Sequence, residues 1–256
     1  MKIATWNVNS IRQREQHVLS WLERNQPDIL FLQEIKCTAD QFPELGLRGL
    51  GYHAEVVGQK SYNGVAVLSR KPVGITHRAL PGLPEDDAQA RYIEIEADGM
   101  ALAGIYLPNG NSGGAAGYAY KLNWMDKLAE RAAELLRADV PLVITGDFNV
   151  CPEAQDLAPG ALGPDDALVR PETRARYHRL IWLGLTDAVR VLRPTGPVWT
   201  FYDYQAAAFE RDSGLRIDHA LLSPTLAERL VSATPDREER AKAQPSDHVP
   251  VLVELA

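Results

Sequence analysis

The chain has 256 residues, and its contents of 45% hydrophobic and 24% charged residues are ordinary for a soluble globular protein. No apolar run approaches the length of a membrane helix, so we expect no membrane-spanning segment. The net charge of −7 is unusual for a nucleic-acid-binding protein, but it does not exclude one, because a bound metal ion reverses the local effect of the carboxylates around it.

The first residues, MKIATWNVNS, begin a strand-like pattern with no basic region ahead of a long apolar stretch, so we expect no signal peptide. Cys37 and Cys151 are the two cysteines. They could form one disulfide, but we predict two buried thiols in a reducing cytoplasm. No Ser/Gly-rich linker divides the chain, and residues 1–256 are predicted to form a single domain.

Short segments rich in Val, Ile and Leu, with Gly, Pro, Asn and Asp between them, are predicted as strands. In chain order they are Lys2–Trp6, Ile29–Gln33, Tyr52–Val57, Gly64–Ser69, Tyr92–Ala97, Met100–Tyr106, Leu142–Thr145, Ala220–Leu222 and Val249–Glu254. Many strands with few helices indicate two sheets packed face to face with helices outside, in the α+β class.

The spacing of apolar residues predicts amphipathic helices over Ile11–Arg24, Lys121–Arg137 and Thr173–Trp182. The segment Pro108–Gly117 contains four glycines and is predicted to be a loop near a binding site, although a plain solvent loop is also compatible with it. Cys151–Pro171 is a second irregular stretch, rich in Pro, Ala and Asp.

Unusual polar residues interrupt or adjoin six of the apolar strands. They are Asn7 and Asn9 after Ile3–Trp6, Gln33 and Glu34 after Ile29–Leu32, Tyr106 and Asn109 after Leu102–Ile105, Asp147 and Asn149 after Leu142–Ile144, Asp218 after Arg216 and Ile217, and Asp247 and His248 before Val249–Val253. Residues two apart in a strand point to the same side, so Asn7 projects with Asn9, and Asp147 with Asn149.

A carboxylate beside a buried strand is costly unless a cation compensates its charge, and Glu34 follows such a strand. Oxygen ligands of this kind suit Mg²⁺. Glu34 could instead reach solvent or pair with Lys36. In Gly146-Asp147-Phe148-Asn149, Asp147 could act as a general base for water and Asn149 could hold that water. The same four residues are also typical of a turn.

Asp218 and Asp247 are the two acids that could orient the imidazole of His248, an arrangement suited to stabilising charge on a phosphate. Neighbouring residues in an extended segment point in opposite directions, so Asp218 is the better partner. His248 could also be a buried core histidine with no further role. We predict that His219 is a buried core histidine of this kind.

Taken together, these acids, amides, Tyr106 and His248 fit metal-assisted attack of water on a phosphodiester. The chain lacks a Gly-x-Ser-x-Gly nucleophile motif, a Cys/His zinc spacing, a P-loop and a dinucleotide-binding fingerprint.

With these motifs in order, the chain resembles the exonuclease III family of bacterial apurinic/apyrimidinic endonucleases, part of the endonuclease/exonuclease/phosphatase superfamily and related in fold to DNase I. The resemblance runs nearly end to end. It is carried by TWNVNSIR at 5–12, PDILFLQEIKC at 27–37, YNGVAVLSR at 62–70, IYLPNG at 105–110, GDFN at 146–149, GLTDAVR at 184–190, GLRIDH at 214–219 and PSDHVPV at 245–251. It implies a four-layered α/β sandwich, in which two mainly antiparallel sheets are flanked by helices.

The resemblance also implies a role for each polar residue. Asn7, Glu34, Asp247, Asp147 and Asn149 match the metal side of the site. Asp147 matches the residue that activates water, Asn149 its orienting partner, and Tyr106 a residue that stabilises the scissile phosphate. Asp218 and His248 match an acid–imidazole pair. The substrate-binding set is Asn9, Asn109, Phe201, Tyr202, Leu215 and Ile217.

Two departures concern the pocket for a baseless sugar. Phe201 and Leu215 stand where some relatives carry tryptophan, so the pocket could be shallower or looser, although Phe201 still offers an aromatic wall. Neither the loop after Asn109 nor Gln205 supplies a bulky side chain to wedge into a duplex. The sequence therefore leaves the balance of endonuclease and exonuclease activity open.

The resemblance implies a cytoplasmic, monomeric DNA-repair enzyme that uses Mg²⁺ or Mn²⁺. Its expected substrate is double-stranded DNA with abasic sites or 3′ ends. It would incise DNA 5′ to abasic sites and remove 3′-terminal nucleotides or blocking groups. Two alternatives remain, a small-molecule phosphoesterase of the same superfamily and a non-catalytic nucleic-acid-binding module.

Overall fold

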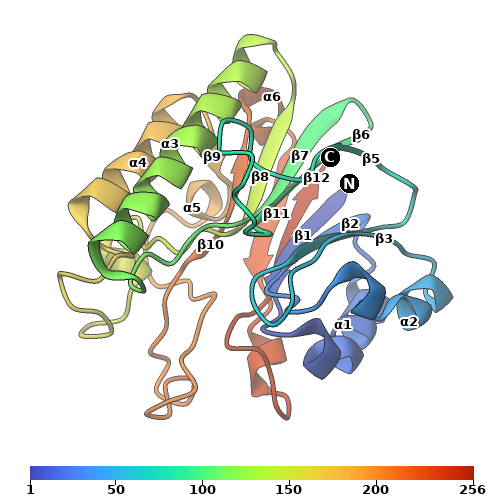
Figure 1. The fold of residues 1–256 in the computed structure, drawn as a ribbon. Coiled ribbons are helices and arrows are strands. Elements are labelled where there is room, and N and C mark those ends of the chain that lie inside the picture. The colour runs from blue at the N-terminus through green and yellow to red at the C-terminus, as the bar shows by residue number, and fades with distance from the viewer.

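The computed structural model describes residues 1–256, and its centre is a pair of six-stranded sheets (Figure 1). The first sheet has the order β11-β12-β1-β2-β4-β3 and the second β5-β6-β7-β8-β10-β9. The strands of the first are β1 (Lys2–Asn7), β2 (Ile29–Gln33), β3 (His53–Val57), β4 (Val65–Ser69), β11 (Leu230–Pro235) and β12 (Val251–Leu255). Those of the second are β5 (Gly74–His77), β6 (Tyr92–Ala97), β7 (Met100–Tyr106), β8 (Leu142–Asp147), β9 (Thr186–Asp187) and β10 (Asp218–Leu222).

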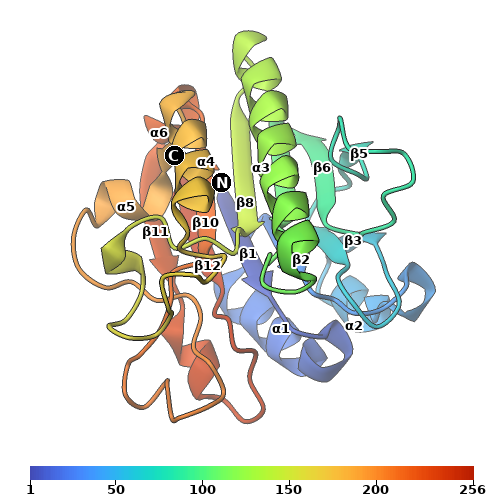
Figure 2. The same cartoon turned by 60° about the vertical axis from the view of Figure 1, so that its left-hand side comes forward.

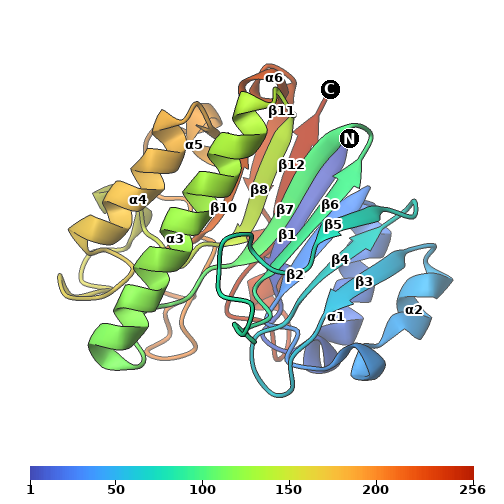
Figure 3. The ribbon, with the colours of Figure 1, turned by 45° about the horizontal axis from the view of Figure 1, so that its top comes forward.

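Helices cover the outer face of each sheet (Figure 3). The first sheet is covered by α1 (Ile11–Asn25) and α2 (Glu44–Gly49), and the second by α3 (Gly114–Arg137) and α4 (Pro171–Trp182), which lie side by side (Figure 2). The shorter helical segments are α5 (Ala188–Leu192), α6 (Pro224–Ala227), η1 (Ala39–Gln41), η2 (Ala154–Asp156) and η3 (Arg237–Ala241).

Alternation along the central strands separates three hydrophobic cores. In β2, Ile29 and Phe31 face the core between the sheets, while Leu30 and Leu32 face the core beneath α1. The two sheets approach closely at Gly104, where a Cβ atom would lie 2.2 Å from the Phe31 ring. The predicted four-layered sandwich with mainly antiparallel sheets is confirmed, since only the pairs β1–β2 and β7–β8 are parallel.

The sequence prediction missed β5, β9 and β11, which are edge strands with little apolar patterning. It also placed the start of α3 at Lys121 instead of Gly114, so the predicted glycine-rich loop is too long. The reason is Gly117, which lies inside the first turns of the helix. A Cβ there would lie 1.8 Å from the Ser112 carbonyl oxygen, so the glycine permits this close turn.

Two simpler predictions can be compared directly with the structure. Cys37 and Cys151 are both buried free thiols, so the prediction that they form no disulfide is confirmed. His219 is wholly buried, with its ring nitrogens beside Arg216 and the Val150 carbonyl, as expected of a core histidine. None of the helices has the length and apolar character needed to cross a membrane.

Candidate active site at the strand ends

The sheet topology brings the polar strand ends to one edge of the sandwich. The parallel strands β1 and β2 end together there, and so do β7 and β8, with Tyr106 opposite Asp147. Strand β10 is antiparallel to β8 and begins at this edge, with Asp218 opposite Asp147. Strand β12 is antiparallel to β1, so the segment that precedes it also reaches the edge. In Figure 1 this edge lies opposite the one that carries the two chain termini.

Five of these residues form one contact network, here called the strand-end cluster: Asn7, Glu34, Asp147, Asp218 and His248. The Asn7 side-chain amide donates to Glu34 Oε1 at 2.8 Å and to Asp147 Oδ2 at 3.0 Å. Because Asn7, Asp147 and Asp218 are buried, their charges and dipoles act on one another with little screening by water.

His248 lies between two carboxylates. Its Nδ1 is 2.8 Å from Asp218 Oδ2, and its Nε2 is 3.7 Å from Asp147 Oδ2. The contact with Asp218 is the one predicted from strand alternation. Burial lowers the pKa of His248, but the charges of Asp218 and Asp147 outweigh that effect, so the net pKa is raised and the ring is an imidazolium at neutral pH.

The two carboxylates that face the centre of the cluster differ in their electrostatics. Burial raises the pKa of Asp147, with a further increase from the charge of Asp218. For Glu34, burial also disfavours ionisation, but the nearby Lys36 ammonium and the Asn7 amide hold its pKa below the ordinary value. Glu34 is therefore ionised at neutral pH, while Asp147 is poised to bind or release a proton.

Tyr106 and Asn149 border the cluster from the ends of β7 and β8. Burial, together with the charges of Glu34 and Asp147, raises the pKa of Tyr106 well above its usual range, so its phenol remains a hydrogen-bond donor. Asn149 accepts a hydrogen bond from the Asn109 amide at 3.1 Å and donates to the Leu107 carbonyl at 2.9 Å. The two asparagines are thus fixed relative to each other.

Unusual backbone conformations accompany these contacts. Asn9, Glu34 and Asn149 all have positive φ, at 44°, 49° and 48°. A non-glycine residue in this region is strained, and the strain persists only where surrounding contacts hold it. At Gly146 a Cβ atom would lie 2.0 Å from the Ile105 carbonyl oxygen, so only glycine allows β8 to approach β7 this closely just before Asp147.

The cluster has the donor set of a metal site. Ligand atoms of Glu34, Asp147 and His248 all lie within 4.8 Å of one another. Because His248 is protonated and held by Asp218, the available ligands are carboxylate oxygens, which suit a hard divalent cation rather than zinc. A cation here would also compensate the buried charge of Asp147.

Asn9 and Asp247 lie at the rim of the cluster rather than at its centre. The Asn9 amide donates to Asp247 Oδ1 at 3.2 Å, and Lys36 Nζ bridges Asn9 and Glu34. The Glu34–Lys36 pair, the alternative to a metal-binding role, is therefore present, and Glu34 Oε1 still accepts the Asn7 amide within the cluster. Tyr204, which the sequence did not single out, joins this rim through a 3.3 Å contact with the Asn9 amide.

The residues predicted to bind the sugar divide into two groups. Phe201 lies with its ring centroid 5.0 Å from that of His248, and Leu215 and Ile217 pack beside it in a small apolar cluster. Tyr202 is instead 2% exposed and packs edge-on against Phe209, so the structure does not bring it to the strand-end cluster.

Sequence reasoning missed three buried polar residues that support the cluster. Thr200 Oγ accepts the backbone N–H of Asp218, Ser246 Oγ donates to the Asn7 carbonyl, and Lys121 Nζ donates to the Asn109 and Asn149 carbonyls. Only Lys121 left a signal, because it precedes Met125 and Leu128 on the apolar face of its helix, where a charge is unusual.

The comparisons with known proteins agree with this geometry. Residues 4–248 match the endonuclease/exonuclease/phosphatase family. The chain is similar to exodeoxyribonuclease III of Haemophilus influenzae, with 34% identity over all of both chains. Among solved structures it is similar to the 3′-5′ exonuclease NExo of Neisseria meningitidis, with a TM-score of 0.95, 40% identity and coverage of 100% of this chain and 99% of that one.

Two further solved structures are also similar over 100% of this chain and 99% of theirs. One is the 3′ phosphatase NExo of Neisseria bound to a product DNA hairpin, with a TM-score of 0.94 and 39% identity. The other is an AP endonuclease from Archaeoglobus fulgidus, with a TM-score of 0.91 and 35% identity. These matches confirm the predicted resemblance and the prediction of a phosphodiester hydrolase. The chain belongs to the endonuclease/exonuclease/phosphatase family, within its exonuclease III branch.

Proposed function

We propose that the chain is a metal-dependent DNA-repair phosphodiesterase that incises duplex DNA 5′ to abasic sites and removes 3′-terminal nucleotides or blocking groups. The observation that carries this proposal is the strand-end cluster, in which Asp147 contacts both Asn7 and His248. The DNA-bound relative and the AP endonuclease relative support DNA as the substrate. Residues 1–256 would act as one domain and as a monomer.

The residues present fit a Mg²⁺ or Mn²⁺ ion. Glu34 and Asp147 would hold it with Asn7, and Asn149 and Asp247 would border it. Bound there, the ion would neutralise charge that develops on the phosphate as water attacks. The hard oxygen donors favour these two cations over softer metals.

The protein's own groups account for the remaining chemistry. Asp147 takes a proton from the attacking water, since its buried carboxylate lies at the centre of the strand-end cluster, in contact with Asn7 and His248. Attack at phosphorus breaks its bond to the 3′ oxygen of the preceding nucleotide, and that oxygen takes a proton from solvent to leave as a 3′ hydroxyl. His248 as an imidazolium, together with the Asn149 amide and the Tyr106 phenol, donates hydrogen bonds to phosphate oxygens as they gain charge.

The test is incision of a synthetic duplex that contains one abasic analogue, with Mg²⁺ and with EDTA. The wild type should cleave 5′ to the analogue only with Mg²⁺, and Asp147→Asn should lower kcat by roughly 100-fold or more. Asp139→Asn, in the exposed turn after α3, is the matched control and should be unaffected. Equal activity of Asp147→Asn and the wild type would remove Asp147 from the mechanism, and binding without cleavage by the wild type would favour a non-catalytic module.

A further inference from the structure

Helix α1 holds the segment of residues 236–246, which connects β11 to the strand-end cluster. Near the end of the helix, Arg24 pairs with two carboxylates of this segment, each at 2.7 Å. In the first turn of the helix, Arg14 contacts the other end of the segment, where its Nη2 donates to the Pro245 carbonyl at 3.0 Å. Arg14 is therefore the contact nearer the active site, two residues before Asp247.

Arg14 is a buried cation whose side-chain partners are all neutral. It is 9% exposed, and buried arginines are ordinarily paired with a carboxylate because an uncompensated charge is costly to bury. Apart from a bond to the Gln13 side chain, its donors go to the Asn9 carbonyl at 2.7 Å, the Tyr204 hydroxyl at 3.2 Å and the Pro245 carbonyl. A forked guanidinium can reach three separate oxygens at once, whereas the single nitrogen of a lysine reaches fewer.

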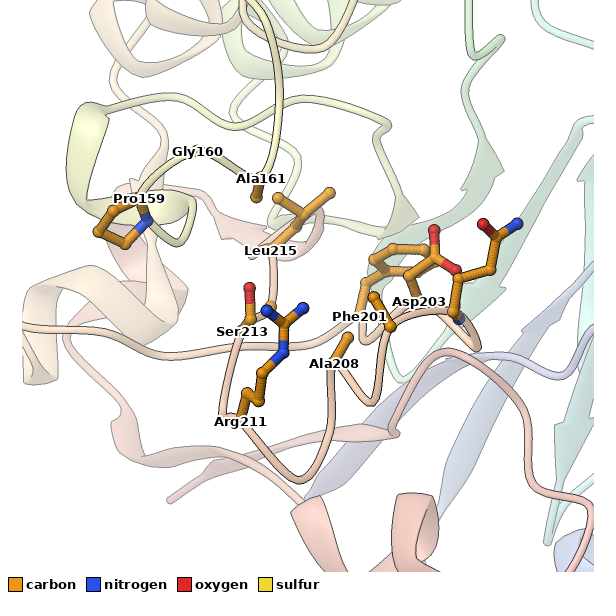
Figure 4. A pocket seen from close by; sticks show the side chains of 12 residues that line it. Pro159, Gly160, Ala161, Phe201, Asp203, Ala208, Arg211, Ser213 and Leu215 are labelled. Atoms are coloured by element: carbon orange, nitrogen blue, oxygen red, sulfur yellow. The ribbon is translucent and has the colours of Figure 1, made fainter.

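The three oxygens that Arg14 binds belong to three segments at the rim of the strand-end cluster. Tyr204 lies in the loop that carries Phe201 (Figure 4). Its phenol donates to the Pro245 carbonyl at 2.9 Å and accepts the Asn9 amide at 3.3 Å. The guanidinium of Arg14 therefore joins the loop after β1, the loop that carries Phe201 and the segment of residues 236–246.

The contact with Asn9 also reaches the centre of the cluster. Asn9 and Ser10 have φ angles of 44° and 90°, a region that residues other than glycine keep only where surrounding contacts hold them. Arg14 binds the carbonyl that lies between these two residues. The backbone N–H of Asn9 donates to Asn7 Oδ1 at 3.0 Å, and the Asn7 amide donates to both carboxylates at the centre of the cluster. The orientation of Asn7 therefore depends on a backbone conformation that Arg14 holds.

We propose that Arg14 is a positioning residue of the active site, which fixes the rim and the Asn7 amide without contacting the substrate. The inference rests on the proposed function and adds to it a residue that lies behind the reacting groups. Because the guanidinium is buried and its partners are protein oxygens, its loss should lower kcat and leave the binding of DNA largely unchanged.

Arg14→Met keeps an apolar stem and removes every donor. On the abasic duplex with Mg²⁺, its kcat should fall roughly 10- to 100-fold, with KM within about twofold of the wild type. Arg14→Lys should recover part of the loss, since an ammonium keeps the charge and some of the donors. If Arg14→Met does not fold, Arg14→Lys alone provides the comparison, with a smaller loss of kcat and an unchanged KM.

Arg24→Met is the matched control, because Arg24 lies on the same helix and holds the same segment through contacts away from the rim. It should lower the free energy of unfolding, measured with urea, and still retain the kcat of the wild type. Assays at a temperature where both variants are fully folded separate the positioning of the site from simple anchoring of the segment.

Hydrogen exchange provides a readout that does not require catalysis. The backbone N–H of Asn9 should exchange with solvent roughly tenfold faster in Arg14→Met than in the wild type or Arg24→Met, because its bond to Asn7 Oδ1 opens more often. The same measurement on Arg14→Lys should give an intermediate rate.

Four results would overturn the proposal. A raised KM with unchanged kcat in Arg14→Met would mean that Arg14 binds DNA, and an equal loss of kcat in Arg24→Met would mean that both arginines only anchor the segment. The other two are a kcat of Arg14→Met equal to that of the wild type and an unchanged exchange rate at Asn9. A wild type that leaves the abasic duplex uncut with Mg²⁺ would instead overturn the proposed function, and the exchange rates would still decide whether Arg14 holds Asn9.

Discussion

At the scale of single residues, His248 carries a positive charge because two carboxylates, Asp218 and Asp147, lie beside its ring. Burial alone favours the neutral imidazole, and the contacts with Asp218 and Asp147 reverse that preference. Asp218 is itself wholly buried and has no water to stabilise its charge. The pair therefore stabilises itself, and each member makes the other's charge tolerable.

Replacing Asp218 with Asn should separate these effects. The largest influence that raises the pKa of His248 disappears while burial remains, so the pKa falls and the imidazolium is lost as pH rises. The alkaline limb of the pH–rate profile for abasic-site incision should move to lower pH, with roughly 100-fold less activity at pH 8. The exposed Asp86→Asn is the control. An Asp218→Asn profile of unchanged shape would show that the charge of His248 does not limit the reaction.

The strand-end residues could be predicted from the sequence because the same pattern recurs: a polar residue directly follows or adjoins a buried apolar strand. The rule could not find Thr200 or Ser246, whose hydroxyls bond to backbone groups of other segments, at residues 217 and 218 for Thr200 and at Asn7 for Ser246. Nor could it separate Phe201, beside His248, from Tyr202, which turns into the loop. Side-chain direction in an irregular segment depends on tertiary contacts, not on a period of two.

At the scale of elements, α3 does more than cover the second sheet. Its wholly buried Lys121 donates to the carbonyls of Asn109 at 2.9 Å and Asn149 at 2.6 Å, and so joins the loops that follow β7 and β8. Burial lowers the pKa of Lys121 to about 7. An ammonium that is costly to bury is retained where its two hydrogen bonds fix the site asparagines.

Lys121→Met keeps the apolar stem and removes both hydrogen bonds. We expect kcat for abasic-site incision to fall roughly 10- to 100-fold, with little change in KM, as for other residues that hold active-site side chains in place without contacting the substrate. The two carbonyls left without a hydrogen bond should each lower the free energy of unfolding by about 1–3 kcal/mol. Removing the buried ammonium should offset this loss, so the melting temperature should change little. Lys127→Met, partly exposed on the same helix, should retain full activity. A loss in Lys121→Met that merely follows its unfolding would argue against a positioning role.

The same helix shows what limits prediction of the elements. Its apolar stripe was evident from Leu122 onward, but its first turns are glycine-rich and depend on a close approach between Gly117 and the Ser112 carbonyl. Strands β5, β9 and β11 form because a neighbouring strand offers free hydrogen-bonding groups, with little contribution from their own apolar pattern. The local sequence of each strand therefore cannot predict it, because its pairing partner lies elsewhere in the chain.

At the scale of the whole molecule, buried ion pairs tie the layers together. Glu94 in β6 is 1% exposed, accepts two hydrogen bonds from Arg131 of α3 at 2.7 and 3.0 Å, and accepts one from the Tyr92 phenol. Arg216 similarly joins Asp156 and Asp187. Each carboxylate must stay ionised for these ion pairs to persist, so the stability of the whole fold should decrease in acid.

The contribution of Glu94 to the pH dependence of stability can be measured. Burial opposes its ionisation, but the hydrogen bonds from Arg131, Tyr92 and Thr76 outweigh burial and lower the pKa to about 2, against about 4.3 in an unfolded chain. A depressed carboxyl pKa stabilises the fold above the unfolded value, and that contribution, about 3 kcal/mol, is lost as pH falls from about 5 towards 2. Glu94→Gln should therefore be less stable than the wild type at pH 7, and the difference should shrink below pH 4.

Urea unfolding at pH 7, 4.5 and 3 measures this difference, with Glu130→Gln, exposed on α3, as the control that should follow the wild type at every pH. Glu94→Gln also deprives Arg131 of one of its two carboxylate partners and leaves it only the exposed Glu134, which adds a cost. The wild type loses the same ion pair once Glu94 is protonated, so this cost also disappears from the difference in acid. A difference that stays constant from pH 7 to pH 3 would mean that Glu94 acts through its shape and hydrogen bonds and not through its charge.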